Sequence, residues 1–379
     1  MGAHGNNAPG VDRGHLFARY WLTASSFWRG RTAGLAWGLT LVLVLIVLLQ
    51  LLVQYLLNFW NRYFFDALAR LDAAALWTQA KLFVPLAAAS IALAAASVWG
   101  RMTAQRKWRE CVTRQVIDYW LANDKFRRLD PFAPDSANPE YRITEDVRIA
   151  TDPPVDLVLG FFASVLTAIV FLGVLWSVGG SFDVQAFGTT WTIPGYLVVS
   201  VVIYSTVFSG AMLMVARPLT GVIESKNQAE AELRAAVDHL RQSNESGRGE
   251  NETRRALWRA VHVTLDRWLD LLWQLVRTTL VTHGNSVIAP TIGLLLCVPK
   301  FLAGTMSLGE LTQSAAAFVT VQSAFNWLVD NYGRFADWRA SVNRVATLLL
   351  ALDALEAEER PAAFVPTPSP RGDSSLLPT

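Results

Sequence analysis

The sequence predicts an all-α membrane protein with six transmembrane helices. Of its 379 residues, 52% are hydrophobic and 17% are charged, whereas an ordinary soluble domain carries about 25% charged residues. The mean hydropathy is +0.29, and the 15 tryptophans suit a chain that crosses many membrane–water boundaries. This composition excludes a disordered protein. The net charge of +2 argues against a nucleic-acid-binding protein, which needs clustered cations.

Six apolar stretches are long enough to cross a hydrocarbon core of about 30 Å at about 1.5 Å per residue. They cover residues 35–57, 82–99, 155–178, 193–216, 278–298 and 308–329. The first four are strongly apolar, while the last two contain several polar residues. A lone helix surrounded by lipid does not tolerate so much polarity, so we expect the fifth and sixth spans to line a wet cavity.

The positions of the cations predict the orientation of the spans. The amino-terminal arm, the loops after spans two and four, and the tail together hold 28 of the 33 lysines and arginines, and the alternate loops hold four. Cations are enriched on the cytoplasmic side of membrane proteins. We therefore expect both termini and both long loops to be cytoplasmic, in a multi-pass protein of the bacterial inner membrane.

The two long loops are expected to form helical hairpins. Apolar residues at helical spacing predict that span two continues as a helix and breaks at Asp130-Pro131. Residues 219–242 extend span four, and residues 252–273 lead back into span five, so that each helix has about 40 or more residues and spans roughly 60 Å. A charged helix of this kind is often only a solvated face. Here the pairing of the helices into two hairpins favours a rigid element that transmits motion between the cytoplasm and the membrane core.

The chain divides into three expected regions. Residues 1–32 form an arm with an interfacial elbow helix, and residues 33–352 form the six-helix transmembrane domain. Residues 353–379 are rich in proline and serine and are expected to be disordered. The first apolar run is too long for a signal peptide, so we expect no cleavable leader.

Several motifs resemble the SbmA/BacA-like and peroxisomal-acyl-transporter-like branch of ABC-exporter transmembrane domains. They are NFWNRYFFDAL (58–68), NPEYRITED (138–146), EAELR (230–234), MSLGELTQ (306–313), and NWLVDNY (326–332) with ADWRA (336–340). The resemblance covers about residues 15–352. It implies a homodimer of six-span halves in the lipid bilayer, in which spans four and five cross to the partner.

The resemblance implies an integral membrane permease for peptide-like or other amphipathic solutes, as the transmembrane part of an ABC-type transporter. The chain contains no G-x-x-x-x-G-K-[ST] motif, so we expect no cofactor here, and ATPase activity would need a separate nucleotide-binding subunit. The alternative is a stand-alone, proton-driven SbmA/BacA-like peptide importer. A third class, a membrane scaffold that transports nothing, stays open. The sequence does not decide the solute, the direction of transport or the energy source.

The candidate solute pathway is carried by spans five and six. At about 100° per residue, the polar residues of span six gather on or beside one arc of about 100°. The pathway candidates are Glu310, Gln313, Thr320, Ser323, Asn326 and Asp330, with Arg277 and His283 from span five. A seam of helix–helix hydrogen bonds is the competing interpretation. The carboxylates near both ends of span six favour a cationic or amphipathic solute.

A second group of candidates concerns proton coupling. In relatives without a nucleotide-binding domain, glutamates of the central helices are implicated in this role, and the matching positions are Glu224, Glu230 and Glu232. A carboxyl pKa raised by burial would be the physical basis, and a solvated surface helix is the alternative. The five histidines and two cysteines are too dispersed for a metal site, and no residue set is typical of catalysis.

Overall fold

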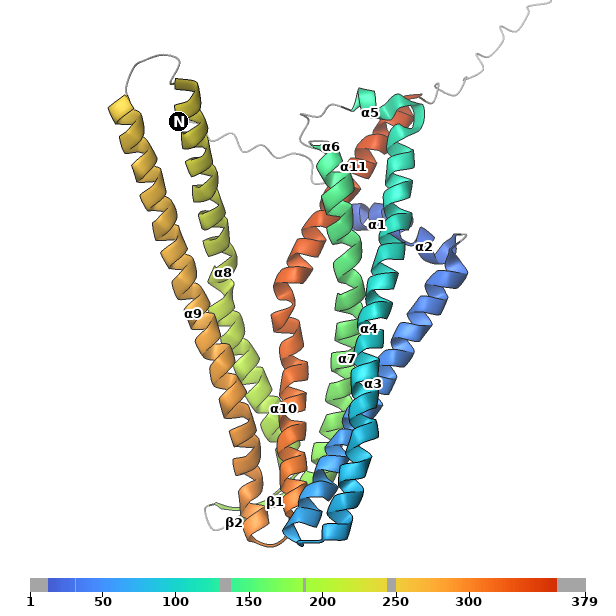
Figure 1. Cartoon of the computed structure of the whole chain (residues 1–379), viewed down its shortest axis with the longest axis vertical. Coiled ribbons are helices and arrows are strands. Elements are labelled where there is room, and N and C mark those ends of the chain that lie inside the picture. The colour runs from blue at the N-terminus through green and yellow to red at the C-terminus, as the bar shows by residue number, and fades with distance from the viewer. Residues whose placement is uncertain (1–12, 31, 130–137, 187–188, 244–249, 360–379) are drawn as a thin grey trace, which may run out of the picture. The chain divides into compact units, whose positions relative to one another are not determined.

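The computed structural model describes residues 13–30, 32–129, 138–186, 189–243 and 250–359, and helices dominate this part of the chain (Figure 1). The α-helices are α1 (Arg13–Ala24), α2 (Ser26–Arg29), α3 (Ala33–Ala69), α4 (Ala73–Leu121), α5 (Lys125–Arg128), α6 (Pro139–Tyr141), α7 (Val147–Gly179), α8 (Tyr196–Ser243), α9 (Glu250–Leu302), α10 (Leu308–Asp330) and α11 (Tyr332–Glu359). A 3₁₀ turn (Ala122–Asp124) precedes α5, a π-helical turn (Arg142–Asp146) precedes α7, and two strands, β1 (Ser181–Ala186) and β2 (Thr189–Pro194), connect α7 to α8.

Five helical segments among the described residues are long and apolar enough to cross a membrane. They are 33–69, 73–128, 139–179, 196–238 and 254–302. They contain predicted spans one, two, three and five, and all of span four except residues 193–195, which lie in strand β2 and the turn that follows it. The prediction of an all-α membrane domain with long helical extensions is confirmed. Helix α10 has 23 residues, about 35 Å of helix, but it is more polar than the others, and its role as a sixth span stays a prediction.

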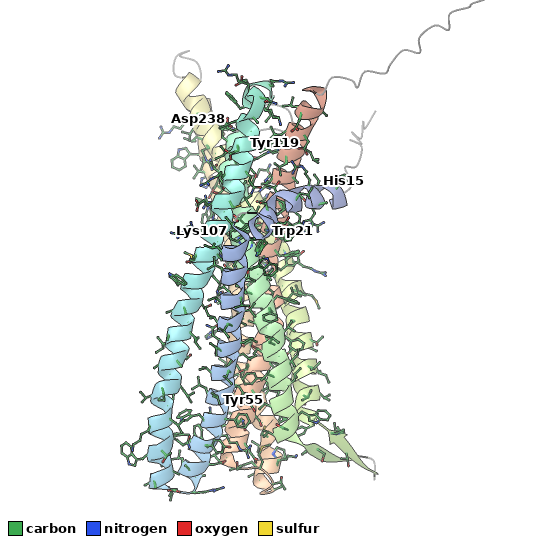
Figure 2. The ribbon with its side chains drawn as sticks, turned by 90° about the vertical axis from the view of Figure 1, so that its right-hand side faces the viewer. His15, Trp21, Tyr55, Lys107, Tyr119 and Asp238 are labelled. Atoms are coloured by element: carbon green, nitrogen blue, oxygen red, sulfur yellow. The ribbon has the colours of Figure 1, made fainter. Side chains whose placement is uncertain are left out.

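One compact unit combines three separate parts of the chain, residues 1–42, 99–157 and 333–379. In its described part, α1 is bound to its neighbours through aromatic side chains. The Trp108 indole of α4 donates to the Ala24 carbonyl over 3.0 Å, and the Tyr20 hydroxyl donates to the Ala150 carbonyl of α7 over 2.8 Å. Figure 2 shows α1 running across α4, with Trp21 on α1 and Tyr119 farther along α4.

The core of this first unit is apolar and well covered. Its most buried residues come from α1, α2, α4, α7 and α11, and they include Tyr20, Phe27, Trp108, Val112, Val116, Val147, Val345, Leu348, Leu349 and Leu352. Burial of each such side chain contributes about 1.5–3 kcal/mol. The first helical hairpin is therefore held by a core to which the amino-terminal and carboxyl-terminal helices both contribute.

The second unit comprises residues 43–98 and 158–332. Helices α8 and α9 form a long antiparallel hairpin, and α10 packs against both of them (Figure 1). The contact between α9 and α10 is close at Gly293, where a Cβ atom would lie 3.2 Å from the Ala315 Cα atom. The two-stranded antiparallel sheet pairs Ser181 with Pro194 and Ala186 with Thr189, and the sequence analysis did not predict it.

Two expected boundaries are wrong. Helix α4 does not continue to Asp130-Pro131, because Asn123 and Asp124 adopt left-handed backbone conformations that end it and turn the chain into α5. The disordered tail was expected to begin at residue 353, which is too early. Helix α11 continues to Glu359, and Asp353 is ion-paired with Arg19. Residues 360–379 and most of the second hairpin tip lie outside the described residues.

Candidate functional site

Glu310 lies in the first turn of α10, where it both caps the helix and forms an ion pair. Its backbone N–H donates to the Ser307 hydroxyl over 3.1 Å, while its carboxylate accepts from the Ser307 N–H over 2.9 Å. This reciprocal capping box satisfies two backbone donors at the helix start. The second carboxylate oxygen lies 2.7 Å from Nη2 of Arg62 on α3. Glu310 is therefore fixed by groups on both sides.

Helix α3 holds α10 through two further polar contacts. The Asp66 carboxylate accepts from the Gly309 backbone N–H over 2.8 Å, and the Asn58 amide donates to the Gln313 carbonyl over 3.2 Å. Gly309 is needed here, because a Cβ atom would lie 2.1 Å from the Arg62 carbonyl oxygen. The side chain of Gln313 is fully buried.

The α3 contribution was missed by the sequence analysis, which placed candidate residues only on the later helices. The missed residues are Asn58, Arg62 and Asp66. Their four-residue spacing directly after the first span places them on one helix face. That spacing was the available signal, and it identifies a polar stripe where an apolar helix leaves its span.

The remaining candidates on α10 do not share one environment. Thr320 is half-buried and donates to the Ala316 carbonyl of its own helix, and Asn326 accepts from the Ser209 hydroxyl of α8 over 3.1 Å. Ser323 and Asp330 are exposed. The predicted polar arc is thus divided between a buried part that contacts α3 and an exposed part nearer the end of α10. Assignment of these residues to a pathway stays a prediction.

Arg277 and His283 both lie on the exposed part of α9. Between α8 and α9, the Tyr204 hydroxyl donates to the Asn285 side chain over 2.8 Å, and the Gln274 amide donates to the Val215 carbonyl. These interhelical hydrogen bonds fix the face that α9 turns towards α8. His283 lies outside that contact. Arg277 lies six residues before His283 on the same helix.

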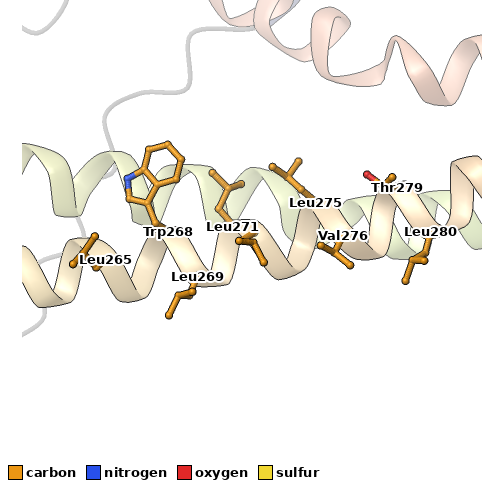
Figure 3. A pocket seen from close by; sticks show the side chains of 9 residues that line it. Leu265, Trp268, Leu269, Leu271, Leu275, Val276, Thr279 and Leu280 are labelled. Carbon is orange, nitrogen blue, oxygen red and sulfur yellow. The ribbon is translucent and has the colours of Figure 1, made fainter.

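An exposed apolar groove follows the same helix from before the fifth span to its first residues. It is lined by Leu265, Trp268, Leu269, Leu271, Leu272, Leu275, Val276, Thr279 and Leu280, and Figure 3 shows these side chains on α9 with α8 behind it. Leu265 and Leu269 are each 53% exposed, and Leu272 is 49% exposed. A contiguous apolar patch of this kind marks an interaction surface.

The proton-coupling candidates lie on α8 beyond the fourth span. Glu224 and Glu232 are exposed, and Glu232 accepts from the Gln228 amide over 3.1 Å. Glu230 lies 2.9 Å from the Lys226 Nζ atom. The hydrogen bond from Lys226 lowers the pKa of the Glu230 carboxyl, which is opposite to the expected direction. The coupling role of the three glutamates stays a prediction.

A protein family and several curated proteins are similar to the chain. The family described as ABC transporter transmembrane region 2 matches residues 27–259, more than half of the chain. The Escherichia coli K12 protein named inner membrane ABC transporter ATP-binding protein YddA is 26% identical over 341 residues, 87% of this chain and 60% of that protein.

Two relatives of lower identity are also named as ABC transporters. An uncharacterized ABC transporter ATP-binding protein of Haemophilus influenzae is 23% identical over 80% of this chain and 51% of its own length. The chloroplastic ABC transporter D family member 2 of Arabidopsis thaliana is 20% identical over 76% of this chain and 39% of its own length. The chain thus spans 60% or less of the length of these three curated relatives.

Proposed function

Because this chain belongs to the ABC transporter transmembrane region 2 family, we propose that it forms the membrane pathway of a homodimeric transporter. The matched family is a transmembrane region and not a catalytic domain. In this proposal two copies move a peptide-like or other amphipathic solute across the inner membrane, and a nucleotide-binding subunit or domain supplies the energy. Both termini lie in the cytoplasm, in accordance with the distribution of cations.

The observation that carries the proposal is the change of polarity along one exposed side of α9. Before the fifth span this side is apolar, with Leu265 and Leu272 exposed. Inside the span, Thr279, His283 and Ser286 recur on it at helical spacing and are exposed, beside the exposed apolar residues Leu280 and Val287. A helix surrounded by water outside the membrane and by lipid inside it needs the opposite order.

Two copies of the chain resolve this change of polarity. A second copy would cover the apolar groove outside the span, and the polar residues inside the span would line an aqueous pathway between the copies. Burial of each leucine would contribute about 1.5–3 kcal/mol to association. The polar face then becomes the surface along which an amphipathic solute moves.

The direction of the Glu230 pKa shift concerns one of the three candidate proton-coupling residues. A residue that binds a proton near neutral pH needs a raised carboxyl pKa, whereas Lys226 lowers the pKa of Glu230. This argues against proton coupling through Glu230 itself. The SbmA/BacA-like resemblance remains the basis of the proton-driven alternative.

The homodimer is tested by native mass spectrometry of the chain in lipid nanodiscs over a range of protein concentrations. Replacement of Leu269 or Leu272 by glutamate is expected to weaken dimerisation at least about tenfold, because a charge is placed in an apolar contact. The control is Arg267→Glu, which changes the charge at an exposed position of the same helix. A monomeric wild-type chain, or leucine variants that dimerise like the control, would contradict the proposal.

Transport is tested in proteoliposomes with a fluorescent amphipathic peptide as the probe. Uptake is expected to require both a dimer and a nucleotide-binding component with ATP. Uptake that depends only on a pH gradient would support the proton-driven alternative instead. No uptake in either arrangement would favour the scaffold interpretation.

A further inference from the structure

The contact between α3 and α10 contains an unbalanced negative charge. Two carboxylates, Asp66 and Glu310, lie close to one guanidinium, Arg62. The Arg62 Nη2 atom is 2.7 Å from Glu310, and its Nε atom is 3.9 Å from Asp66. The formal charge of these three groups is therefore −1. A further cation would neutralise it.

Arg62 occupies this position loosely compared with other arginines of the chain. Arg344 binds Asp146 through both Nε and Nη2, and Arg19 binds Asp353 in the same two-point manner. Arg62 makes one hydrogen bond to Glu310, and its Nε atom has no hydrogen-bond partner among the described residues. Two-point pairing is the stronger geometry for an arginine and a carboxylate.

Solvent reaches the three charged side chains. Their exposed fractions are 30% for Arg62, 26% for Glu310 and 18% for Asp66. A partly hydrated carboxylate can exchange its cation, whereas a fully buried carboxylate such as Asp146 would be left as an unpaired, desolvated charge. The cluster is thus open to competition from a dissolved cation.

Buried hydrogen-bond acceptors without donors adjoin the cluster. Asn58 lies about one turn before Arg62 on α3 and Asn61 directly precedes it, and their side-chain oxygens have no donor among the described residues. Asn58 is only 6% exposed, and its amide nitrogen already contacts α10 at Gln313. The fully buried Gln313 side chain is also without a partner in this part of the chain. Among the described residues, three unpaired acceptor oxygens (Asn58, Asn61 and Gln313) thus stand beside two unpaired donor nitrogens, Gln313 Nε2 and Arg62 Nε. The acceptors match a ligand rich in N–H donors.

We propose that Asp66 and Glu310 form a binding site for the guanidinium or primary ammonium group of a solute, and that Arg62 is an internal cation which the solute displaces. An incoming cation offers several N–H donors to the carboxylates and to the asparagine oxygens. Displacement of Arg62 would release one of the polar contacts between α3 and α10. The role of the site in transport rests on the proposed function, but binding is measurable without transport.

The test is equilibrium binding of agmatine, which carries a guanidinium and an ammonium group, to the purified full chain in nanodiscs. Arg62→Gln is expected to bind agmatine about tenfold more tightly than wild type, because the competing cation is gone. Glu310→Gln and Asp66→Asn are expected to bind at least about tenfold more weakly. Both keep an oxygen acceptor for the helix cap and the Gly309 N–H, which protects the fold.

Two controls make the result specific. Glu110→Gln removes an exposed carboxylate of α4 that pairs with Lys107, and it should bind agmatine like wild type. Butylurea, a neutral analogue, should not bind any variant. The proposal is overturned if Arg62→Gln binds no more tightly than wild type, or if Glu310→Gln binds as well as wild type. Neither result touches the dimer or uptake measurements, so the proposed function stands or fails separately.

Discussion

The two helical hairpins of this chain arise from similar mixtures of charged and apolar residues, but they differ in what covers them. In the first hairpin, Val112 and Val116 of α4 are fully buried, because α1, α7 and α11 supply packing partners. In the second hairpin, Leu265 and Leu269 of α9 remain more than half exposed. The comparison teaches that the first hairpin buries its apolar residues within one chain, whereas the second leaves an apolar face uncovered, which we propose a second copy covers.

Charged side chains show the same contrast. Asp146 is fully buried and accepts hydrogen bonds from Nε and Nη2 of Arg344. Lys125 is 1% exposed and lies 3.0 Å from Glu356 and 3.7 Å from the centre of the Tyr119 ring. In the α8–α9 hairpin the Arg267–Asp270 pair is exposed, and the Lys226–Glu230 pair is partly exposed. Buried pairs specify the first hairpin, and surface pairs contribute little to the second.

The largest effect is expected from breaking the buried ion pair. Arg344→Ala leaves the Asp146 carboxylate buried without its main partner, and should lower the free energy of unfolding by about 3–5 kcal/mol. Urea unfolding in mild detergent, followed by tryptophan fluorescence, measures this change. The matched control is Arg148→Ala, which breaks a partly exposed pair with Glu145 and should cost less than about 1 kcal/mol. Equal effects of the two variants would refute the contrast.

A smaller effect is expected from truncating apolar side chains. Leu348→Ala removes a fully buried side chain of the first unit and should cost about 2–5 kcal/mol. Leu269→Ala on the exposed groove should change the unfolding of the monomer by less than about 0.5 kcal/mol. The same urea titration, made at a concentration where the chain is monomeric, compares the two. A large loss for Leu269→Ala would show that a segment of the same chain covers the groove.

Acid should weaken the first unit through Asp353. Burial tends to raise the pKa of this carboxyl, but the hydrogen bonds from Arg19 and Tyr119 outweigh burial and lower it. A carboxyl whose pKa is lower in the folded state than in the unfolded state stabilises the fold at pH values above its unfolded-state pKa of about 3.9. This contribution is lost as the pH falls through the folded-state pKa. Melting temperatures should therefore drop below about pH 4. Asp353→Asn should reduce that drop, and an unchanged profile would argue against this cause.

The smallest effect is expected at Glu230. Its carboxyl pKa is lowered by Lys226, so it is ionised at neutral pH and Glu230→Gln should leave the pH dependence of uptake between pH 6 and pH 8 unchanged, within about twofold. The proteoliposome assay with the amphipathic peptide measures this. A profile that shifts or disappears in the variant would restore Glu230 as a proton-coupling residue.

Much of the fold was predictable because hydrophobic length and charge act locally. The apolar runs predicted the five helices that are long and apolar enough to cross a membrane, and the mixed periodicity after them predicted the long helical extensions. The end of α4 was missed because left-handed residues at Asn123 and Asp124, neither of them glycine, give no strong sequence signal. The extension of α11 was missed because Asp353 is held by Arg19, a residue 334 positions away in the sequence.

The candidate site was predictable only in part. Glu310 and Gln313 were identified from the polarity of their own helix, but their partners Arg62 and Asn58 lie about 250 residues earlier. Helical periodicity within one segment does not reveal which other helix it meets. The apolar groove of α9 was likewise hidden, because an exposed leucine and a buried leucine look the same in a sequence.

The central claim is that one face of α9 lines an aqueous pathway between two copies. Single cysteines at Ser286 and Ile288, in a Cys111→Ser and Cys297→Ala background, test it most directly, because both native residues are exposed in one chain and lie about 160° apart around the helix. Labelling by a membrane-impermeant thiol reagent in proteoliposomes is expected for S286C and not for I288C. Protection of both cysteines, or labelling of I288C alone, would contradict the account.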